Sequence, residues 1–313
     1  MWGWVLPSNR SAIYNKGFKM KALVTGATGF IGTYLAQCLI SSGRYETVYK
    51  TDIVTNGQDD IIVADLTSID GVNSLPDDVD VLFHLAAYNG TKHFYTYPMS
   101  VLYNTTLPLM QVIQRYKGNL KKIVYASSSE VYSGNETIEF PTPEVNRVSI
   151  NDLTNPRWSY ASGKMSGEVA VHSAHKEYGI DYVIVRYHNV YGKGQQLHFI
   201  PEFSERLANG DGELYGYDHT RSFTYVDDAV YLTNKLDELS VNETFNIGNP
   251  RETSVLEVAQ LIKEIQKIDT EIQPADAWDG CATRRIPDVS KMLSVVGDYK
   301  FIDIKSGLQK TLL

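Results

Sequence analysis

The stretch TGATGFIG, residues 25–32, is the feature that most limits what this chain can fold into. It places Gly26, Gly29 and Gly32 between KALVT, which predicts a strand, and FIGTYLAQCLISSG, which predicts an amphipathic helix. Glycines at this spacing permit a tight turn and a close approach of the backbone to a pyrophosphate, while the helix N-terminus supplies N–H donors. Three glycines also occur by chance in ordinary loops. The prediction of a dinucleotide site therefore depends on their position directly after a predicted strand.

A carboxylate lies where the ribose of a dinucleotide needs one. Asp52 ends the second predicted strand, TVYKTD, twenty residues after Gly32. It can accept hydrogen bonds from a ribose 2′-hydroxyl and would repel a 2′-phosphate, which favours NAD over NADP. The plain alternative is a turn residue at a strand end. Further expected cofactor contacts also lie at strand ends: Asp65 and Leu66 beside the adenine, and Leu85, Ala86 and Ala87 where the fourth strand ends.

Strand and helix patterns alternate from Met20 to about residue 190. The strands are nearly continuous apolar runs, which indicates a parallel sheet covered on both faces. The predicted fold class is α/β, a Rossmann-type doubly wound parallel sheet with a smaller C-terminal substrate-binding lobe. We expect residues 1–19 to form a poorly ordered extension, 20–190 the NAD-binding domain, and 191–313 the substrate-binding lobe, interleaved with the first without a clean linker.

The composition is that of an ordinary soluble protein, with 43% hydrophobic and 21% charged residues in a chain of 313. A net charge of −8 gives no reason to expect nucleic acid or an anionic membrane as partner. Only two cysteines occur, which predicts neither a disulfide framework nor a metal cluster and fits a reducing cytoplasm. An anionic small ligand would need a local group of arginines or lysines.

The segment RWSYASGK, residues 157–164, places Tyr160 and Lys164 four residues apart on one predicted helix face. An ammonium beside a phenol favours the phenolate, so Lys164 is expected to lower the pKa of Tyr160. A tyrosine with a lowered pKa can act as a general base near neutral pH. An ordinary exposed helix face is the alternative that these two residues alone leave open.

Seven motifs in this order resemble the extended short-chain dehydrogenase/reductase family of nucleotide-sugar epimerases, dehydratases and decarboxylases. They are TGATGFIG, FHLAA, YASSSEVY, YASGK, RYHNVYGKG, RSFTYVDD and RRIPDV, and the resemblance covers the chain from Met20 onward. It implies a catalytic set in which Ser128 holds a sugar hydroxyl, Tyr160 removes its proton, and Lys164 tunes Tyr160 and binds the nicotinamide ribose. The substrate is then a nucleotide sugar, most simply a UDP-sugar, oxidised at C4 by NAD to a 4-keto sugar.

The same resemblance implies further contacts. Cofactor contacts are expected from Phe30, Ile31, Asn104 and Tyr187, in addition to the residues above. Substrate contacts are expected from Ser128, Ser129, Asn189, His198, Arg221 and Arg285, because guanidinium groups bind phosphate in a bidentate manner. For His198 a neutral loop histidine is the expected role.

Glu130 bears on which reaction follows. A carboxylate beside the catalytic serine resembles 4,6-dehydratases and UDP-glucuronate decarboxylases, as does Arg157 before Tyr160, and Arg285 is a candidate for proton transfer in a decarboxylase. The run HNVYGKG instead resembles epimerases and dehydratases. We therefore expect an NAD-dependent epimerase or dehydratase, with a decarboxylase using Glu130 and Arg285 as the alternative. An NADPH-dependent carbonyl reductase and a non-catalytic dinucleotide sensor also remain open.

Two residues depart from the family pattern, Ser133 after the VY of YASSSEVY and Gly163 before Lys164. Neither removes a reacting group, but a glycine within a helix costs about 1 kcal/mol. Members of the family often pair through the helices that include the Tyr–Lys segment, so a homodimer is expected.

Overall fold

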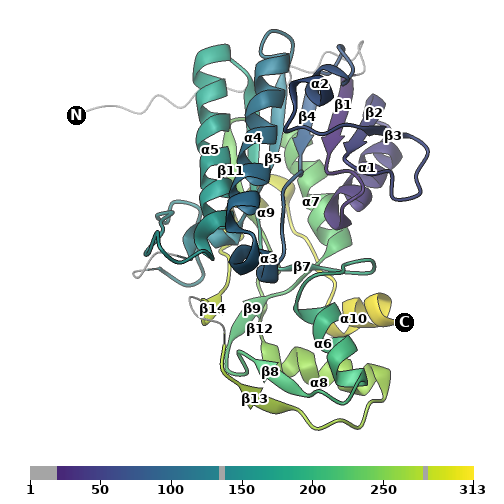
Figure 1. Ribbon diagram of the computed structural model, residues 1–313, viewed down its shortest axis with the longest axis vertical. Helices are drawn as coiled ribbons and strands as arrows, with labels where there is room; N and C mark the ends of the chain where they lie inside the picture. Colours follow the sequence, from purple (N-terminus) through teal and green to yellow (C-terminus); the bar gives the residue numbers. More distant parts are fainter. Residues whose placement is uncertain (1–19, 134–137, 278–280) are drawn as a thin grey trace.

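The computed structural model describes residues 20–133, 138–277 and 281–313. The expectation for residues 1–19 lies outside these residues. Within them, the chain forms an upper body of sheet and helices and a smaller lobe below it (Figure 1).

The centre of the upper body is a parallel sheet, which has seven strands among the described residues. Its order is β11-β6-β5-β4-β1-β2-β3, and each strand pairs in parallel with its neighbours. The order reverses direction beside β1, as in a doubly wound fold. The strands are β1 (Met20–Thr25), β2 (Tyr45–Asp52), β3 (Ile61–Val63), β4 (Val81–His84), β5 (Lys122–Ser128), β6 (Asp181–Tyr187) and β11 (Glu243–Ile247).

Helices cover both faces of this sheet, and the alternation of β1 shows how. Ala22 and Val24 pack into one hydrophobic core, whereas Leu23 between them packs into a second core on the opposite face. A strand with both faces buried must be apolar throughout, which explains the continuous run in the sequence. The first core includes α1 (Phe30–Ser42) and α7 (Val226–Leu239), and the second includes α2 (Ile69–Asn73), α4 (Pro98–Tyr116) and α5 (Trp158–Tyr178).

The smaller lobe follows β6 but does not hold all of the later chain. Both α7 and β11 come from the range 191–313 and return to the helix layer and the sheet. Ser254 caps α8 (Val255–Gln266), since its Oγ accepts a hydrogen bond from Glu257 N at 3.0 Å. The lobe and its connections comprise β7 (Val190–Tyr191), α6 (Phe199–Ala208), β8 (Glu213–Tyr215), β9 (Thr220–Ser222), β10 (Thr224–Tyr225), β12 (Glu252–Ser254), α8 (Val255–Gln266), β13 (Gln273–Ala275), β14 (Arg284–Arg285) and α10 (Ile304–Leu312). The helix α9 (Ser290–Val296) instead packs against α7 and β11 of the upper body.

Gly163 has a structural purpose that the sequence did not reveal. A Cβ built on Gly163 would lie 2.8 Å from the side chain of Thr105 on α4. One turn later, a Cβ on Gly167 would lie 2.0 Å from the hydroxyl of Tyr125 on β5. The two glycines therefore let α5 pack closely against both α4 and the sheet, which sets the depth at which the Tyr160–Lys164 turn lies.

Replacing Gly163 with alanine tests this packing. Although alanine favours the helix, we expect Gly163→Ala to lower the free energy of unfolding by about 1–3 kcal/mol, because its methyl group overpacks against Thr105. Urea denaturation measures the change. Gly118→Ala is the matched control, since a Cβ at Gly118 meets nothing within 4 Å. Equal or greater stability of Gly163→Ala would contradict the close packing.

Candidate active site

The candidate residues gather where the parallel strands end. The glycine loop follows β1, Asp52 ends β2, Ser128 ends β5, and Asn189 follows β6. Ligands of open α/β sheets bind at this carboxyl edge, near the point where the strand order reverses. The topology alone therefore brings together residues that are far apart in the sequence.

The glycine loop is shaped for a close backbone approach. Gly26 has a φ of +68°, and a Cβ there would lie 2.8 Å from Ala86 N. A Cβ at Gly32 would lie 1.9 Å from Gly26 O, so the first turn of α1 packs directly on the loop. A side chain is thus excluded at Gly26 and Gly32, beside the N-terminus of α1, which lets a pyrophosphate approach the backbone. These residues fit the dinucleotide that the sequence predicted.

Asp52 lies beside this loop. Its Oδ2 accepts hydrogen bonds from Thr28 N at 3.0 Å and Thr28 Oγ1 at 2.8 Å, and its Oδ1 accepts one from Ile53 N at 2.7 Å. A carboxylate offers about four acceptor positions. Asp52 therefore orients the loop and still has acceptor capacity for a ribose hydroxyl.

Other expected cofactor residues have local partners in the fold. Tyr187 is 7% exposed and its hydroxyl lies 2.6 Å from Thr233 Oγ1. Asn104 Nδ2 donates to Ser100 O within α4, and Asp65 accepts hydrogen bonds from Thr67. The rest lie at the strand edge or at the start of α1: Leu66 is buried in the second core, whereas Phe30, Ile31, Leu85, Ala86 and Ala87 are half-buried.

Tyr160 is buried on α5. Burial, then the negative charge of Glu130, raises the pKa of Tyr160, and a hydrogen bond with Ser128 opposes that rise. Ser128 Oγ also accepts a hydrogen bond from Glu130 N at 3.2 Å, so it caps the 3-10 turn η1 (Ser129–Tyr132). The structure thus brings Ser128 and Tyr160 together.

The sequence predicted that Lys164 lowers the pKa of Tyr160. This prediction is wrong, because the protein groups around Tyr160 raise its pKa. Lys164 Nζ donates to Ala126 O at 2.6 Å and lies 5.6 Å from the centroid of the Tyr160 ring. The ammonium therefore faces the ring and a carbonyl. Burial also lowers the pKa of Lys164 to about 7, with Glu168 acting against that shift. Desolvation of both groups outweighs the electrostatic help that the helical spacing predicted.

Glu130 lies between two arginines. Its Oε1 is 2.9 Å from Arg285 Nη1 and 3.3 Å from Arg157 Nη2, and all three side chains are at most 16% exposed. Although burial opposes ionisation, Arg285 and Arg157 lower the pKa of Glu130 to about 2. Glu130 is therefore a carboxylate held by charge, and Arg157 and Arg285 are part of the same cluster.

A third arginine extends the positive charge. Arg221 donates to the carbonyls of Thr220, Ala282 and Thr283. Burial and the neighbouring Arg285 lower the pKa of Arg221 to about 9. With Arg157 and Arg285, it outnumbers the single carboxylate of Glu130, so this side of the site favours an anion.

The remaining expected substrate residues frame this cluster. Asn189 has a φ of +34°, and its Nδ2 donates to Ser222 O at 3.0 Å. His198 Nε2 lies 3.4 Å from Asn89 Nδ2, and burial lowers the pKa of His198, which keeps it neutral. Ser129 is buried and lines a small cavity with Arg285.

Two features of the site were missed by the sequence analysis. Glu168 lies one turn after Lys164 and forms a buried ion pair with Arg186 at 2.7 Å. Glu168 Oε1 also accepts a hydrogen bond from Ser127 Oγ. Phe94, within the aromatic segment YNGTKHFYTYP, stacks on Tyr160 with ring centroids 5.0 Å apart. The helical spacing of Lys164 and Glu168 could have indicated the first feature, but nothing in the sequence pairs Phe94 with Tyr160.

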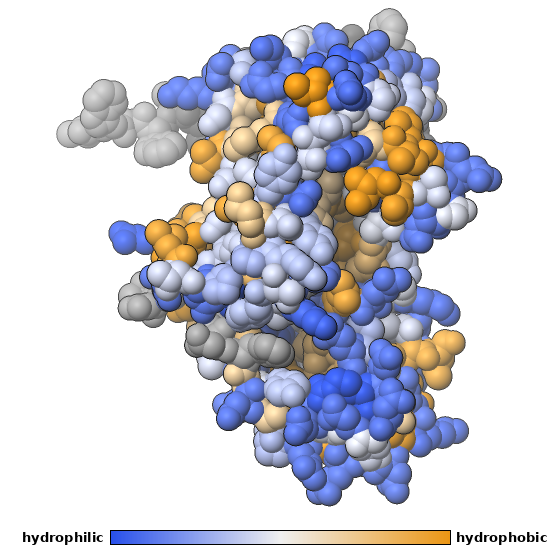
Figure 2. All heavy atoms as spheres, in the orientation of Figure 1, coloured by the Kyte–Doolittle hydropathy of each residue, from blue (hydrophilic) through white to orange (hydrophobic). Residues whose placement is uncertain are grey.

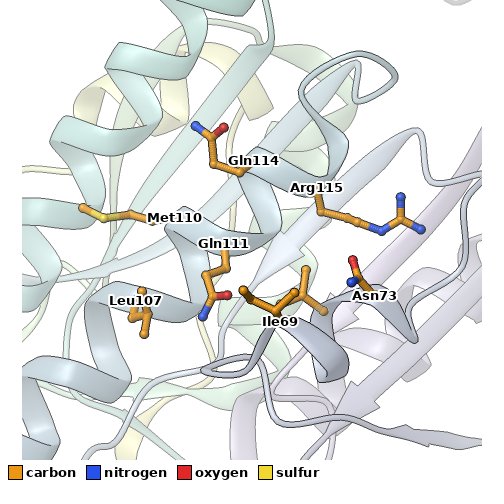
Figure 3. Close-up of a pocket in the computed structure, with 8 residues that line it drawn as sticks. Ile69, Asn73, Leu107, Met110, Gln111, Gln114 and Arg115 are labelled. Atoms are coloured by element: carbon orange, nitrogen blue, oxygen red, sulfur yellow. The ribbon is translucent and has the colours of Figure 1, made fainter.

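A separate groove of about 510 Å³ lies between α2 and α4 (Figure 3). It contains none of the candidate site residues. Its lining is mostly apolar and comes from the two helices: Ile69, Val72 and Asn73 on α2, and Leu107, Met110, Gln111, Gln114 and Arg115 on α4.

Comparison with known families agrees with this geometry. The family model described as the NAD dependent epimerase/dehydratase family matches residues 22–248. The chain belongs to this family. The resemblance, the α/β fold, the NAD cofactor and the assignment as an enzyme, all predicted from the sequence, are thereby confirmed. The NADPH-dependent reductase and the non-catalytic sensor lose their support.

Several individual members of the NAD-dependent epimerase/dehydratase family are similar over nearly the whole chain. UDP-glucuronic acid decarboxylase 6 of Arabidopsis thaliana is 28% identical, covering 96% of this chain and 91% of its own. A UDP-N-acetyl-alpha-D-glucosaminuronate decarboxylase of Bacillus cytotoxicus is 30% identical, covering 94% and 97%. The solved structure of UDP-glucose 4-epimerase from Thermotoga maritima with UDP-glucose superposes with a TM-score of 0.83 at 27% identity, covering 93% and 97%.

No helix in residues 20–133, 138–277 and 281–313 combines the length and the apolar character needed to cross a membrane.

Removing the charge of Glu130 tests the electrostatics of this enzyme. Because Glu130 raises the pKa of Tyr160, Glu130→Gln should lower that pKa, and a step that needs the phenolate should then begin at lower pH. The measurement is the rising limb of kcat/KM against pH with NAD bound. Glu252→Gln, which removes a surface carboxylate paired with Arg284, is the control and should leave the limb in place. A limb that moves to higher pH in Glu130→Gln would contradict this account.

Proposed function

We propose that this enzyme oxidises C4 of a nucleoside-diphosphate sugar, with Tyr160 removing the proton of the C4 hydroxyl. The contact between Ser128 and Tyr160 supports these roles, because a serine beside the base can hold the same hydroxyl. Lys164 supports Tyr160 from within α5, with its ammonium fixed on Ala126 O. The glycine loop and Asp52 would hold NAD, which would supply the oxidant for C4 and a cationic nicotinamide that favours the Tyr160 phenolate.

We further propose that the sugar carries a carboxylate, as in a nucleotide-linked uronate. The observation that carries this proposal is the excess of arginine over carboxylate around Glu130. Nε and Nη1 of Arg157 and Nε of Arg285 are buried and have no hydrogen-bond acceptor among the residues described. Buried guanidinium donors require acceptors, and a sugar carboxylate supplies two oxygens in bidentate geometry. The names of the two curated relatives, both decarboxylases of UDP-linked uronates, point the same way.

Decarboxylation is the outcome that this geometry favours. A keto group at C4 is β to the C6 carboxylate, so the C5–C6 bond can break and carbon dioxide can leave. The electron pair of that bond passes into an enolate across C4 and C5, and a proton then adds at C5. Glu130, with a pKa lowered to about 2, is a poor base for a C5 proton, so a dehydration that needs such a base has less support. In this proposal Glu130 positions the arginines.

A 4-epimerase acting on the same class of sugar is the second candidate. The pair of Ser128 and Tyr160 is sufficient for an oxidation and return at C4 without any loss of carbon. The similarity in fold to UDP-glucose 4-epimerase is consistent with that outcome.

A product assay distinguishes these reactions. We expect purified enzyme with NAD to convert UDP-glucuronate to a product that has lost carbon dioxide, as read by mass spectrometry. An unchanged mass with inversion at C4, read by NMR, would identify the epimerase instead. Faster turnover of UDP-glucose than of UDP-glucuronate would contradict a uronate substrate.

Two neighbouring arginines on β14 provide a matched pair of variants for the same assay. Arg285→Met should lower kcat/KM for UDP-glucuronate by about a hundredfold, as the loss of a buried charge pair predicts. Arg284→Met, which loses the exposed pair with Glu252 and the contact of its guanidinium with the Phe140 ring, is the control and should change kcat/KM by less than about threefold.

We propose that the enzyme is a homodimer that pairs through α4 and α5. Tyr103, Leu107 and Met110 share one face of α4 at helical spacing, and Tyr103 and Met110 are 46% and 41% exposed. Val169 on α5 is 64% exposed. The apolar groove beside α4 includes Leu107 and Met110 (Figure 3), and Figure 2 shows separate apolar patches on a mostly hydrophilic face. A second copy of the chain would cover these residues.

Light scattering tests the dimer. The wild-type enzyme should have the mass of two chains, and the double variant Tyr103→Glu/Met110→Glu should have the mass of one, because charges cannot be buried there without partners. Val145→Glu, at an apolar residue that is 92% exposed outside α4 and α5, is the control and should remain dimeric. A monomeric wild-type enzyme would contradict the proposal.

A further inference from the structure

The ring of Phe94 lies flat against the ring of Tyr160. Phe94 is on α3 (Thr91–Thr96), and the two ring planes are only 15° apart at a centroid separation of 5.0 Å. Phe94 is 4% exposed and Tyr160 is 7% exposed, so each ring shields one face of the other from water. Figure 1 shows α3 at the end of α4 that lies nearest the smaller lobe.

Tyr160 does not belong to either main core. It forms a small hydrophobic cluster of its own with Phe94 and Val101, and the half-buried residues Ala87, Tyr88 and Tyr95 pack around it. Buried aromatic pairs add about 0.5–1.5 kcal/mol beyond their burial. The Tyr160 ring is therefore positioned by this cluster more than by the two hydrophobic cores on the faces of the sheet.

The polar neighbours of Tyr160 act at its hydroxyl or through charge, apart from Lys164, whose Nζ lies 5.6 Å from the ring centroid. Lys164, from the same helix, is bound to Ala126 O, and Ser128 acts at the hydroxyl. Glu130 on η1 acts on Tyr160 through its negative charge. Phe94 is the neighbour that forms a flat contact, and a rotation of the Tyr160 ring would break it.

The segment around Phe94 is itself held in place. Gly90, which precedes α3, has a φ of +128°, a conformation that favours glycine. Asn89 Oδ1 accepts a hydrogen bond from Gly90 N, and Asn89 Nδ2 lies 3.4 Å from His198 Nε2 at the start of α6. Tyr88 stacks on His93 with centroids 4.6 Å apart. Phe94 is thus presented by a loop that also contacts the smaller lobe.

We propose that Phe94 is a positioning residue for the reaction, which fixes the plane of the Tyr160 ring and excludes water from one of its faces. The proposal rests on the proposed function, because it concerns Tyr160 as the base. A base displaced by about 1 Å loses about a hundredfold in rate, so a residue that holds the ring acts on kcat. Since Phe94 contacts Tyr160 and no sugar contact is assigned to it, its loss should leave substrate binding nearly unchanged.

Phe94→Leu separates orientation from general packing. Leucine keeps the site apolar but removes the flat face, so kcat should fall by about tenfold to a hundredfold while KM for the nucleotide sugar stays within about twofold. Tyr97→Leu, at a 54% exposed aromatic residue at the end of the same helix, is the control and should keep its kcat. Thermal melting confirms that both variants are folded. A folded Phe94→Leu enzyme with full kcat would overturn the orienting role.

Phe94→Ala tests the exclusion of water. Burial is the largest cause of the raised pKa of Tyr160, so admitting water should move that pKa downward. The phenolate should then appear at lower pH in Phe94→Ala than in the wild-type enzyme. NMR of isotope-labelled tyrosine measures this titration, with the Tyr160 signal assigned by its absence from Tyr160→Phe. An unmoved titration in the folded variant would overturn the shielding role.

The NMR measurement also keeps the two proposals apart. It follows the ionisation of Tyr160 with NAD bound and without turnover, so it reports on Phe94 whatever sugar the enzyme accepts. If Tyr160→Phe keeps full activity, the proposed function fails. A shift in Phe94→Ala would still show that Phe94 controls the environment of Tyr160.

Discussion

The burial of one carboxylate between arginines connects the parts of this enzyme. Glu130 follows β5, Arg157 precedes α5, and Arg285 lies on β14 of the smaller lobe. A buried charge is tolerated only when it is paired and hydrogen-bonded, so these three segments must meet at one point. The helix that carries Tyr160 and the lobe expected to hold the substrate are therefore fixed relative to the same carboxylate.

A second buried ion pair connects α5 to the central sheet. Glu168 binds Arg186 of β6 through both carboxylate oxygens and accepts a hydrogen bond from Ser127 of β5. Together with Gly163 and Gly167, which allow close packing, it fixes α5 against the sheet. One face of the Tyr160 ring remains uncovered by these contacts, and Phe94 stacks on it.

Much of the fold and part of the site could be predicted from local patterns. The glycine loop and the apolar strands are local signals, and the structure has them where they were expected. The expected lowering of the pKa of Tyr160 failed because helical spacing reports which residues share a face, not how far water is excluded from them. Tyr187 and Asn104, which are expected to contact the cofactor, also have hydrogen-bond partners in Thr233 and Ser100 that local patterns do not indicate.

The sequence by itself determined the doubly wound sheet, the glycine loop and the shared helix face of Tyr160 and Lys164, because each depends on spacing along a strand, turn or helix. Only the tertiary structure decided that Glu130 is an ionised carboxylate between Arg157 and Arg285, and that Phe94 lies on Tyr160. These contacts join segments separated by up to 155 positions in the chain. Their geometry and their shielding from water exist only once the layers have packed.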